Sequence, residues 1–283
     1  MRLRGIRRSK NVEVRGGGGG GRGRAGKAGG VGIVGVLAVL AISYFTGIDV
    51  SPLLNGGSTT QTQQSVPASQ TDDHATQFSA QVLATTEDVW TKIFREQLDR
   101  TYQPPTLVVF SNVTQSPCGG ASGATGPFYC PADEKAYLDT SFFDMLSQRM
   151  GAGGDFAAAY VIAHEVAHHV QNELGILPKV NAARQRASKA EANALTVRLE
   201  LMADCLSGIW ATNVQGLMEK GDLEEALNAA RKIGDDHLQR QAGRVPQPHT
   251  FTHGTSEQRA RWFARGYDSG NVGRCDTFAA DRL

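Results

Sequence analysis

The chain has 283 residues, of which 40% are hydrophobic and four are cysteines, and its formal net charge is +1. It is too hydrophobic for a wholly disordered protein, and it has too few cysteines for a small protein built on disulfides. The length indicates one sizeable domain with appended segments. The charge is uneven, because residues 1–30 carry nine Lys or Arg and one acid, which leaves −7 for the remainder.

The N-terminal region combines a basic segment with an apolar one. Residues 1–28 are rich in Gly and Arg, and the 21 residues from Ala28 to Ile48 contain no charged side chain. At about 1.5 Å per residue such a run is long enough to cross the roughly 30 Å hydrocarbon core of a bilayer. We therefore expect a cytoplasmic head over 1–28 and a transmembrane signal anchor over 29–49, in contact with membrane lipid. The protein would be a single-pass cell-membrane protein with its body outside the cytoplasm.

Two other interpretations of the apolar run are a buried core helix and a cleaved signal peptide. Gly32 and Gly35 argue against a core helix, and the long basic segment without a clear cleavage site argues against a signal peptide. The Arg/Gly-rich head could also bind RNA, but it has no aromatic residues on which bases could stack. Attraction to anionic lipid explains the head more simply, so we expect no nucleic-acid partner.

The pattern of the remaining chain predicts a polar linker followed by one folded domain, called the body below. Residues 50–75 are rich in Ser, Thr, Gln and Gly and indicate a flexible linker, so the body would span 76–283. An amphipathic pattern predicts a helix over 77–99, and TLVVF at 106–110 predicts a strand. FYC and KAYLD are expected to pair as antiparallel strands, and AYLD (136–139) could be an edge strand that binds extended substrate. The fold class is α+β, mainly helical, with a small β-sheet and one preceding transmembrane helix.

Four cysteines allow three disulfide pairings. A Cys118–Cys130 bond would close a short Gly-rich loop, and a Cys205–Cys275 bond would tie the C-terminal tail to a helix. Buried free thiols are the alternative. No two cysteines have CxxC spacing, which excludes a zinc ribbon built on cysteines.

Two helices in the body have predicted ends. Asp155 is expected to cap the start of the first helix, and Gly175 to take a left-handed conformation after its end. The second helix, over 188–211, begins with Ser188 and Glu191, which match a capping box. These two helices carry the residues that could bind a metal ion or transfer a proton.

The first helix contains an HExxH sequence, and the second contains two acids on one face. His164 and His168 are one helical turn apart, so both imidazoles can reach one Zn²⁺ ion, and Glu165 can accept a proton from a zinc-bound water. A catalytic zinc takes a third protein ligand. Glu200 can supply it, and Asp204 can accept the other N–H of a ligand histidine. The alternative is a solvated acidic stripe that pairs with Arg198.

HEVAH followed by ELMAD resembles the HExxH…ExxAD signature of gluzincin metallopeptidases. More closely, the chain is similar to the neutral zinc metallopeptidase family of bacterial membrane proteins. That resemblance implies a zincin-like fold, one Zn²⁺ per chain on His164, His168 and Glu200, and Glu165 as general base. It also implies a peptide or protein substrate for a membrane-anchored endopeptidase. The segments that carry it are RRSKNVEVRGGGGG, GPFYCPADEKAYLD, HEVAHHVQ, RLELMADCLSGIWA and FTHGTSEQRARWF.

Such enzymes usually add a donor opposite the metal, and His253 is the candidate. His249 and Tyr160 are weaker choices, and His169 points about 100° around the helix from His168, so it is not expected to be a ligand. The competing function is a zinc-stabilised scaffold or binding module without catalysis, which would be favoured if His253 were a fourth ligand. The sequence indicates no oligomeric state and no specific substrate.

Overall fold

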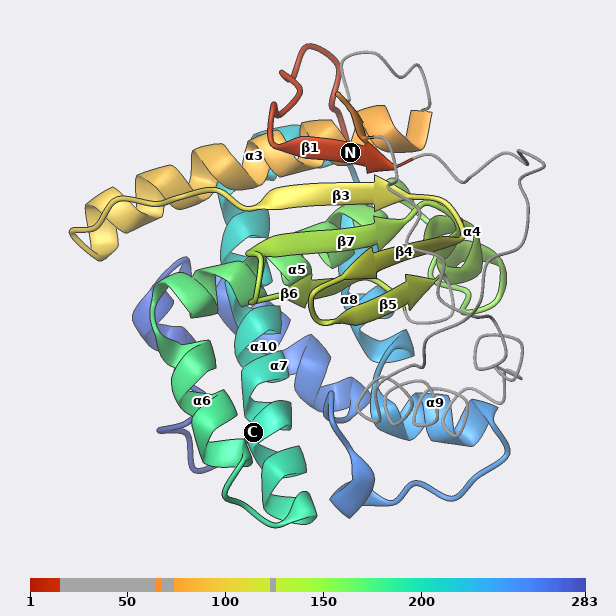
Figure 1. Ribbon diagram of the computed structural model, residues 1–283, viewed down its shortest axis with the longest axis vertical. Coiled ribbons are helices and arrows are strands. Elements are labelled where there is room, and N and C mark those ends of the chain that lie inside the picture. The colour runs from red at the N-terminus through yellow and green to blue at the C-terminus, as the bar shows by residue number, and fades with distance from the viewer. Residues whose placement is uncertain (16–64, 68–73, 123–125) are drawn as a thin grey trace, which may run out of the picture.

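The computed structural model describes residues 1–15, 65–67, 74–122 and 126–283 (Figure 1). A five-stranded mixed sheet has the strand order β2-β1-β3-β7-β6, with β1, β3 and β7 parallel and the outer strands antiparallel to their neighbours. A separate hairpin consists of β4 and β5. The strands are β1 (Val12–Arg15), β2 (Ser65–Pro67), β3 (Thr106–Phe110), β4 (Val113–Ser116), β5 (Gly119–Ser122), β6 (Phe128–Cys130) and β7 (Lys135–Asp139).

The helices account for most of the described chain, so the α+β, mainly helical class is confirmed. Short 3-10 turns η3 (Gln215–Leu217), η4 (Pro248–Thr250) and η5 (Val272–Cys275) lie between or after them. The α-helices are α3 (His74–Gln97), α4 (Ser141–Gln148), α5 (Asp155–Glu173), α6 (Ile176–Arg184), α7 (Lys189–Asn213), α8 (Asp222–Lys232), α9 (Asp235–Gln241) and α10 (Ser256–Ser269).

Alternating side chains on the central strands separate two apolar clusters. Leu107 and Val109 of β3 enter the main core with α3, α5, α7 and α10, whereas Val108 and Phe110 enter a smaller cluster with Tyr137. Successive side chains of a strand point to opposite faces, so a five-residue apolar strand is buried on both. The sheet therefore supports α5 through β6 and β7, and α7 packs against α5.

Several predicted elements are confirmed, and two details differ. The expected 77–99 helix is α3, and the FYC and KAYLD strands are antiparallel neighbours. However, β7 lies between β3 and β6, so AYLD is not an edge strand; β6 is the edge. Asp155 does not cap α5, because the N-cap is Gly154 and Asp155 is the first helical residue. Gly175 has the expected left-handed conformation, with φ +72°.

Residues 1–15 lie against the body, which the expected division into a head (1–28) and a body (76–283) did not anticipate. β1 pairs in parallel with β3 over four residues, from Val12 opposite Leu107 to Arg15 opposite Phe110. Ser9 and Asn11 both donate to the Glu87 carboxylate of α3, at 2.5 and 2.8 Å. The head therefore contributes a strand to the sheet.

The Met1 amino group is enclosed by three carboxylates of the body. It lies 2.7 Å from Asp155, 3.2 Å from Asp222 and 3.3 Å from Glu219. Asp155, Asp222 and Glu225 are close enough to one another to suggest a cation site. The ammonium group already supplies the positive charge at this cluster.

Both suggested disulfides are present, Cys118–Cys130 and Cys205–Cys275. They join the β4–β5 hairpin to β6 and the C-terminal segment to α7. The expected transmembrane segment, 29–49, and most of the linker fall outside the described residues. Within the part of the chain that is described, no helix is both long and apolar enough to span a bilayer.

Candidate metal centre

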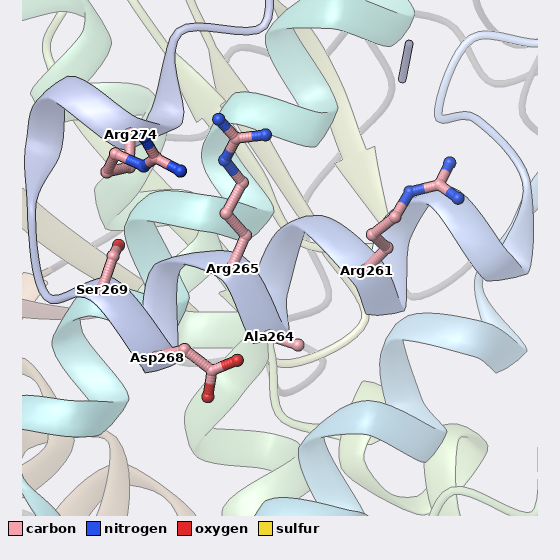
Figure 2. Close-up of a pocket in the computed structure, with 6 residues that line it drawn as sticks. All are labelled: Arg261, Ala264, Arg265, Asp268, Ser269 and Arg274. Carbon is pink, nitrogen blue, oxygen red and sulfur yellow. The ribbon is translucent and has the colours of Figure 1, made fainter.

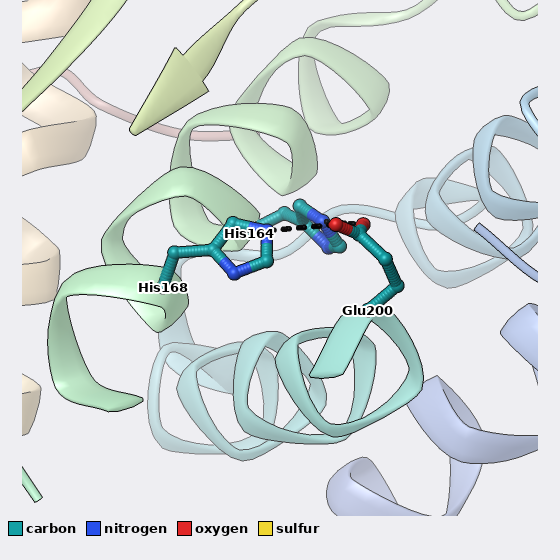
Figure 3. A group of neighbouring side chains, drawn as sticks. All are labelled: His164, His168 and Glu200. Carbon is teal, nitrogen blue, oxygen red and sulfur yellow. Dashed lines mark hydrogen bonds and ion pairs between the residues drawn. The ribbon is translucent and has the colours of Figure 1, made fainter. Parts of the chain in front are cut away.

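Helices α5 and α7 bring three side chains to one point (Figure 3). The Nε2 atom of His164 lies 3.1 Å from one oxygen of Glu200, and the Nε2 atom of His168 lies 3.4 Å from the other. One ligand atom from each of the three residues lies within 4.8 Å of the others. Zinc–ligand bonds of about 2.1 Å at tetrahedral angles place neighbouring ligand atoms about 3.4 Å apart, which is close to these separations.

The Nδ1 atoms of both histidines have hydrogen-bonding partners on the side away from Glu200. His164 Nδ1 lies 2.9 Å from Asp204 Oδ1, and His168 Nδ1 lies 2.9 Å from Gln171 Oε1. Since these partners are acceptors, each histidine donates from Nδ1, and its Nε2 points toward Glu200. A metal ion that took the place of the proton on each Nε2 would be bound by both imidazoles and the Glu200 carboxylate. The donor set therefore fits zinc.

Gln171 connects α5 to α7 beside the ligands. Its amide nitrogen donates to the Leu199 carbonyl oxygen at 2.7 Å, one residue before Glu200 on α7. Its oxygen simultaneously accepts from His168. One buried amide thus holds a ligand histidine of α5 beside the ligand carboxylate of α7. The sequence analysis did not anticipate Gln171, although it lies one turn after His168 in the same helix.

Charge and burial oppose each other at the three ligands. Burial disfavours the imidazolium form of His164, but Asp204 and Glu200 raise its pKa to about 10. Burial also acts against ionised Glu200, yet His168 and His164 hold its pKa well below the ordinary value. A buried carboxylate with histidine partners is a stable anion at neutral pH. Glu200 is therefore available as an anionic ligand.

Glu165 differs from Glu200 in its environment. Glu165 is only 8% exposed. Burial raises the pKa of its carboxyl group above the ordinary value, although His168 and His164 oppose the rise. A raised pKa makes a carboxylate a better proton acceptor near neutral pH. Its position beside His164 on α5 places that acceptor next to the ligand set.

Asp204 is the centre of a buried network. It is fully buried, accepts from Tyr160 Oη at 2.6 Å, and pairs with Arg259 of α10 through Nε at 2.8 Å and Nη2 at 3.0 Å. Burial works against the ionised form, but Arg259 and His164 hold the pKa of Asp204 below its ordinary value. The alternative of a solvated stripe is wrong for Asp204. Arg198 instead donates to the carbonyl oxygens of Thr277 and Ala280.

Sequence reasoning left Arg259 without a role. The available signal was indirect: a predicted buried Asp requires a cationic or hydrogen-bonding partner, and Arg259 lies in the FTHGTSEQRARWF block. Tyr160, considered as a weak candidate donor, is buried and directed at Asp204 rather than at solvent.

The His253 side chain lies in the loop before α10 and is half exposed, with 49% of its surface accessible. Its Nδ1 is 3.3 Å from Asp235 Oδ1, while Asp235 Oδ2 accepts the backbone N–H groups of Thr252, His253 and Gly254. Partial loss of solvent around the imidazole opposes protonation, but Asp235 and the charge of Glu200 raise the pKa of His253. The imidazole is thus within electrostatic reach of the ligand set. Asp235 was not anticipated from the sequence.

Other histidines of the body have different roles. His169 is buried, with Nε2 2.6 Å from the Gln103 carbonyl oxygen and Nδ1 3.0 Å from Tyr129 Oη, so it links α5 to β6 and faces away from the ligands. His249 is exposed, and its backbone oxygen accepts from Asn193. Among the ranges that the structure covers, the group of mutually close ligand atoms at this centre contains three residues, and His253 is not one of them.

A mainly helical α+β body with an HExxH helix against a second helix that carries the third ligand is the arrangement of a zincin-type metallopeptidase. The sequence profile of the family described as "Putative neutral zinc metallopeptidase" matches residues 1–278, and the chain belongs to this family.

Relatives with similar sequences occur in bacteria. A protein of Escherichia coli strain K12, named "Uncharacterized protein YpfJ", is 48% identical over 285 residues, which cover 98% of this chain and 99% of the relative. A Mycobacterium tuberculosis protein, "Uncharacterized protein Rv2575", is 41% identical over 195 residues, covering 64% of this chain and 65% of the relative. No solved structure matches the chain.

Proposed function

We propose that this protein is a zinc-dependent endopeptidase whose active site is the α5–α7 centre. The observation that carries the proposal is the convergence of His164 Nε2, His168 Nε2 and the Glu200 carboxylate beside a buried Glu165. A structural zinc site has four protein ligands and needs no neighbouring base, whereas a catalytic site keeps a position for water. The family supports a peptidase, and a peptidase acts on a peptide or protein substrate.

Each side chain then has a definite task. A bound Zn²⁺ would supply Lewis-acid chemistry and lower the pKa of a water toward about 7. Glu165 takes the proton of the attacking water and returns it to the leaving amine. His253, held by Asp235, donates to the carbonyl oxygen of the substrate as negative charge develops there. Asp204 and Gln171 keep both ligand histidines in the tautomer that leaves Nε2 free.

The decisive experiment separates metal binding from proton transfer in the full-length chain. Glu165→Gln removes the base but none of the three ligands. We expect it to retain about one zinc per chain while cleavage of an unfolded protein substrate falls roughly 10²- to 10⁴-fold. Glu173→Gln, near the end of the same helix, is the matched control and should cleave like the wild type. Zinc content is measured by elemental analysis, and cleavage by mass spectrometry of the products.

Two outcomes would contradict this assignment. If Glu165→Gln cleaved substrate as fast as the wild type, Glu165 would not be the base. A wild-type chain that holds zinc tightly but cleaves nothing in a broad peptide mixture would favour the zinc-stabilised scaffold. Removing zinc with a chelator should abolish cleavage, and adding zinc back should restore it.

We also propose that the apolar run over 29–49 holds the protein at the cell membrane. Two disulfides support a body located in an oxidising compartment outside the cytoplasm, where such bonds persist. Fractionation of cells and alkaline extraction of membranes test the attachment. A protein lacking 29–49 that stayed in the membrane fraction would contradict it.

A further inference from the structure

Arg259 is buried between the metal centre and the loop that carries His253. Only 1% of the residue is exposed, and its guanidinium forms two parallel hydrogen bonds with the Asp204 carboxylate. Its Nη2 also lies 3.5 Å from His164 Nδ1. Such a bidentate pair fixes the carboxylate in both distance and orientation.

The orientation of Asp204 matters because one of its oxygens has three neighbours. Asp204 Oδ1 accepts from Tyr160 and Arg259 and lies 2.9 Å from His164 Nδ1. A carboxylate that turned would release His164 Nδ1, and the proton could then move to Nε2, where it would block metal binding. The guanidinium fork prevents this rotation.

The charge of Arg259 supports the same role. Its Nε lies 2.8 Å from Asp204 Oδ2, and both side chains are buried. An apolar residue in place of Arg259 would leave Asp204 as a buried, uncompensated anion.

Arg259 also reaches the other side of the site. Its Nη1 donates to the Ile233 carbonyl oxygen at 3.3 Å, two residues before Asp235. Asp235 in turn accepts three backbone N–H groups of the loop that carries His253. The same guanidinium thus contacts both the Asp204–His164 pair and the segment that holds the candidate donor.

We propose that Arg259 is a positioning residue of the metal site, which holds Asp204 so that His164 keeps its Nε2 lone pair directed at the metal. The proposal rests on the proposed metal centre. Its effect is on metal affinity and ligand geometry, and no contact of Arg259 with substrate is required.

The test uses full-length Arg259→Met and Arg259→Lys, because β1 belongs to the sheet and a shortened body would lack it. Arg265→Lys is the matched control, since Arg265 lies on the same helix at an open surface hollow of about 490 Å³ that Arg261 and Arg274 also line (Figure 2). Zn²⁺ affinity is measured by competition with a chelator of known affinity. The visible absorption spectrum of the Co²⁺-loaded protein reports ligand geometry without any activity assay.

We expect Arg259→Met to bind Zn²⁺ about 10- to 100-fold more weakly and to shift the Co²⁺ bands, as loss of a residue that orients a ligand does. Arg259→Lys keeps the charge but loses the fork, so it should lie between wild type and Arg259→Met. The control should match the wild type.

The outcomes separate the two proposals. If the wild type takes up neither metal, the proposed function fails, and this inference fails with it. If the wild type binds metal and either Arg259 variant has a wild-type spectrum and affinity, the positioning role alone is overturned. If Arg259→Met does not fold, Arg259→Lys decides. A variant that is less heat-stable but has an unchanged Co²⁺ spectrum when folded would make Arg259 structural only.

A second inference follows from β1. Adjacent strands lie about 4.8 Å apart, whereas the hydrocarbon core of a bilayer is about 30 Å thick. β1 and β3 are hydrogen-bonded neighbours, so residues 12–15 and the body occupy one side of any membrane. A single crossing between residue 15 and the body is incompatible with this pairing. We infer that residues 1–15 and 74–283 lie on the same side of the membrane.

Single cysteines at exposed positions test this directly. Arg4→Cys reports on the N-terminal segment and Val245→Cys, at 80% exposure, on the body. A membrane-impermeant maleimide applied to intact and then permeabilised spheroplasts should label both sites in the same condition. Labelling of one site before permeabilisation and the other only afterwards would overturn the inference. Lys10→Cys, also exposed, repeats the N-terminal measurement.

Discussion

At the scale of single residues, two glycines set the distance between α7 and α10. A Cβ atom on Gly266 would overlap the Cys205 carbonyl oxygen, and one on Gly208 would overlap the Phe263 carbonyl oxygen. The backbones of the two helices touch at these points. Arg259 is on the same helix as Gly266, so this close approach also sets how far its guanidinium reaches toward Asp204.

We predict that Gly266→Ala lowers the free energy of unfolding by about 3 kcal/mol, because a methyl group forced into a packed contact displaces the backbone. Urea denaturation followed by circular dichroism measures the change. Gly216→Ala is the control, since Gly216 is exposed and a Cβ there meets nothing within 4 Å. An effect of Gly266→Ala as small as that of the control would contradict the backbone contact.

At the scale of elements, one carboxylate joins the start of α9 to the start of α10. Asp236 accepts from the Ser256 backbone N–H at 2.7 Å, from its hydroxyl at 2.8 Å and from Arg240 at 3.0 Å. Burial acts against the anion, but the bonds from Ser256 and Arg240 hold the pKa of Asp236 below its ordinary value. The anion also interacts favourably with the N-terminal end of α10.

A lowered folded-state pKa means that Asp236 stabilises the fold above its unfolded-state pKa, near 4, and that this contribution is lost as pH falls through the folded-state pKa. We predict that Asp236→Asn is less stable than the wild type at pH 7 and that the difference shrinks as the solution becomes more acidic. Chemical denaturation across this pH range measures it. Asp268→Asn, at an exposed position of α10, is the control and should be about as stable as the wild type at pH 7. A constant difference for Asp236→Asn would contradict the linkage.

At the scale of the whole molecule, the two disulfides close loops of different length. Cys205–Cys275 spans 70 residues and joins α7 to the C-terminal segment, whereas Cys118–Cys130 spans 12. Chain-entropy estimates give about 4 kcal/mol for the longer loop and about 3 kcal/mol for the shorter one. The longer bond lies on the helix that carries Glu200 and Asp204.

We predict that Cys205→Ser/Cys275→Ser lowers the thermal unfolding midpoint more than Cys118→Ser/Cys130→Ser does. The Cys205→Ser/Cys275→Ser variant should also bind zinc more weakly, because α7 loses its covalent link to the C-terminal segment. Calorimetry and zinc titration of the two double variants provide the comparison. A larger loss of stability from the short loop would show that local packing at β6, and not loop length, determines the order.

Much of the site could be predicted from local sequence because its residues lie on two helices. HExxH spacing places His164 and His168 on one helical face in any α-helix, and the capping box at Ser188 with Glu191 is present as expected. Fold class and both central strands were also predicted, and the two disulfides form one of the three pairings that the sequence allowed. These features depend on spacing of a few residues, on apolar periodicity or on a small number of pairings.

The tertiary structure decided everything that depends on distant contacts. Arg259 meets Asp204 across 55 positions, Asp235 meets the loop of His253 across 18, and β1 meets β3 across about 95. The apolar periodicity of the sequence does not predict such contacts, since they arise only when the helices pack and the sheet forms. Local spacing therefore determined which residues can bind the metal, and packing of the core decided which residues hold them in place.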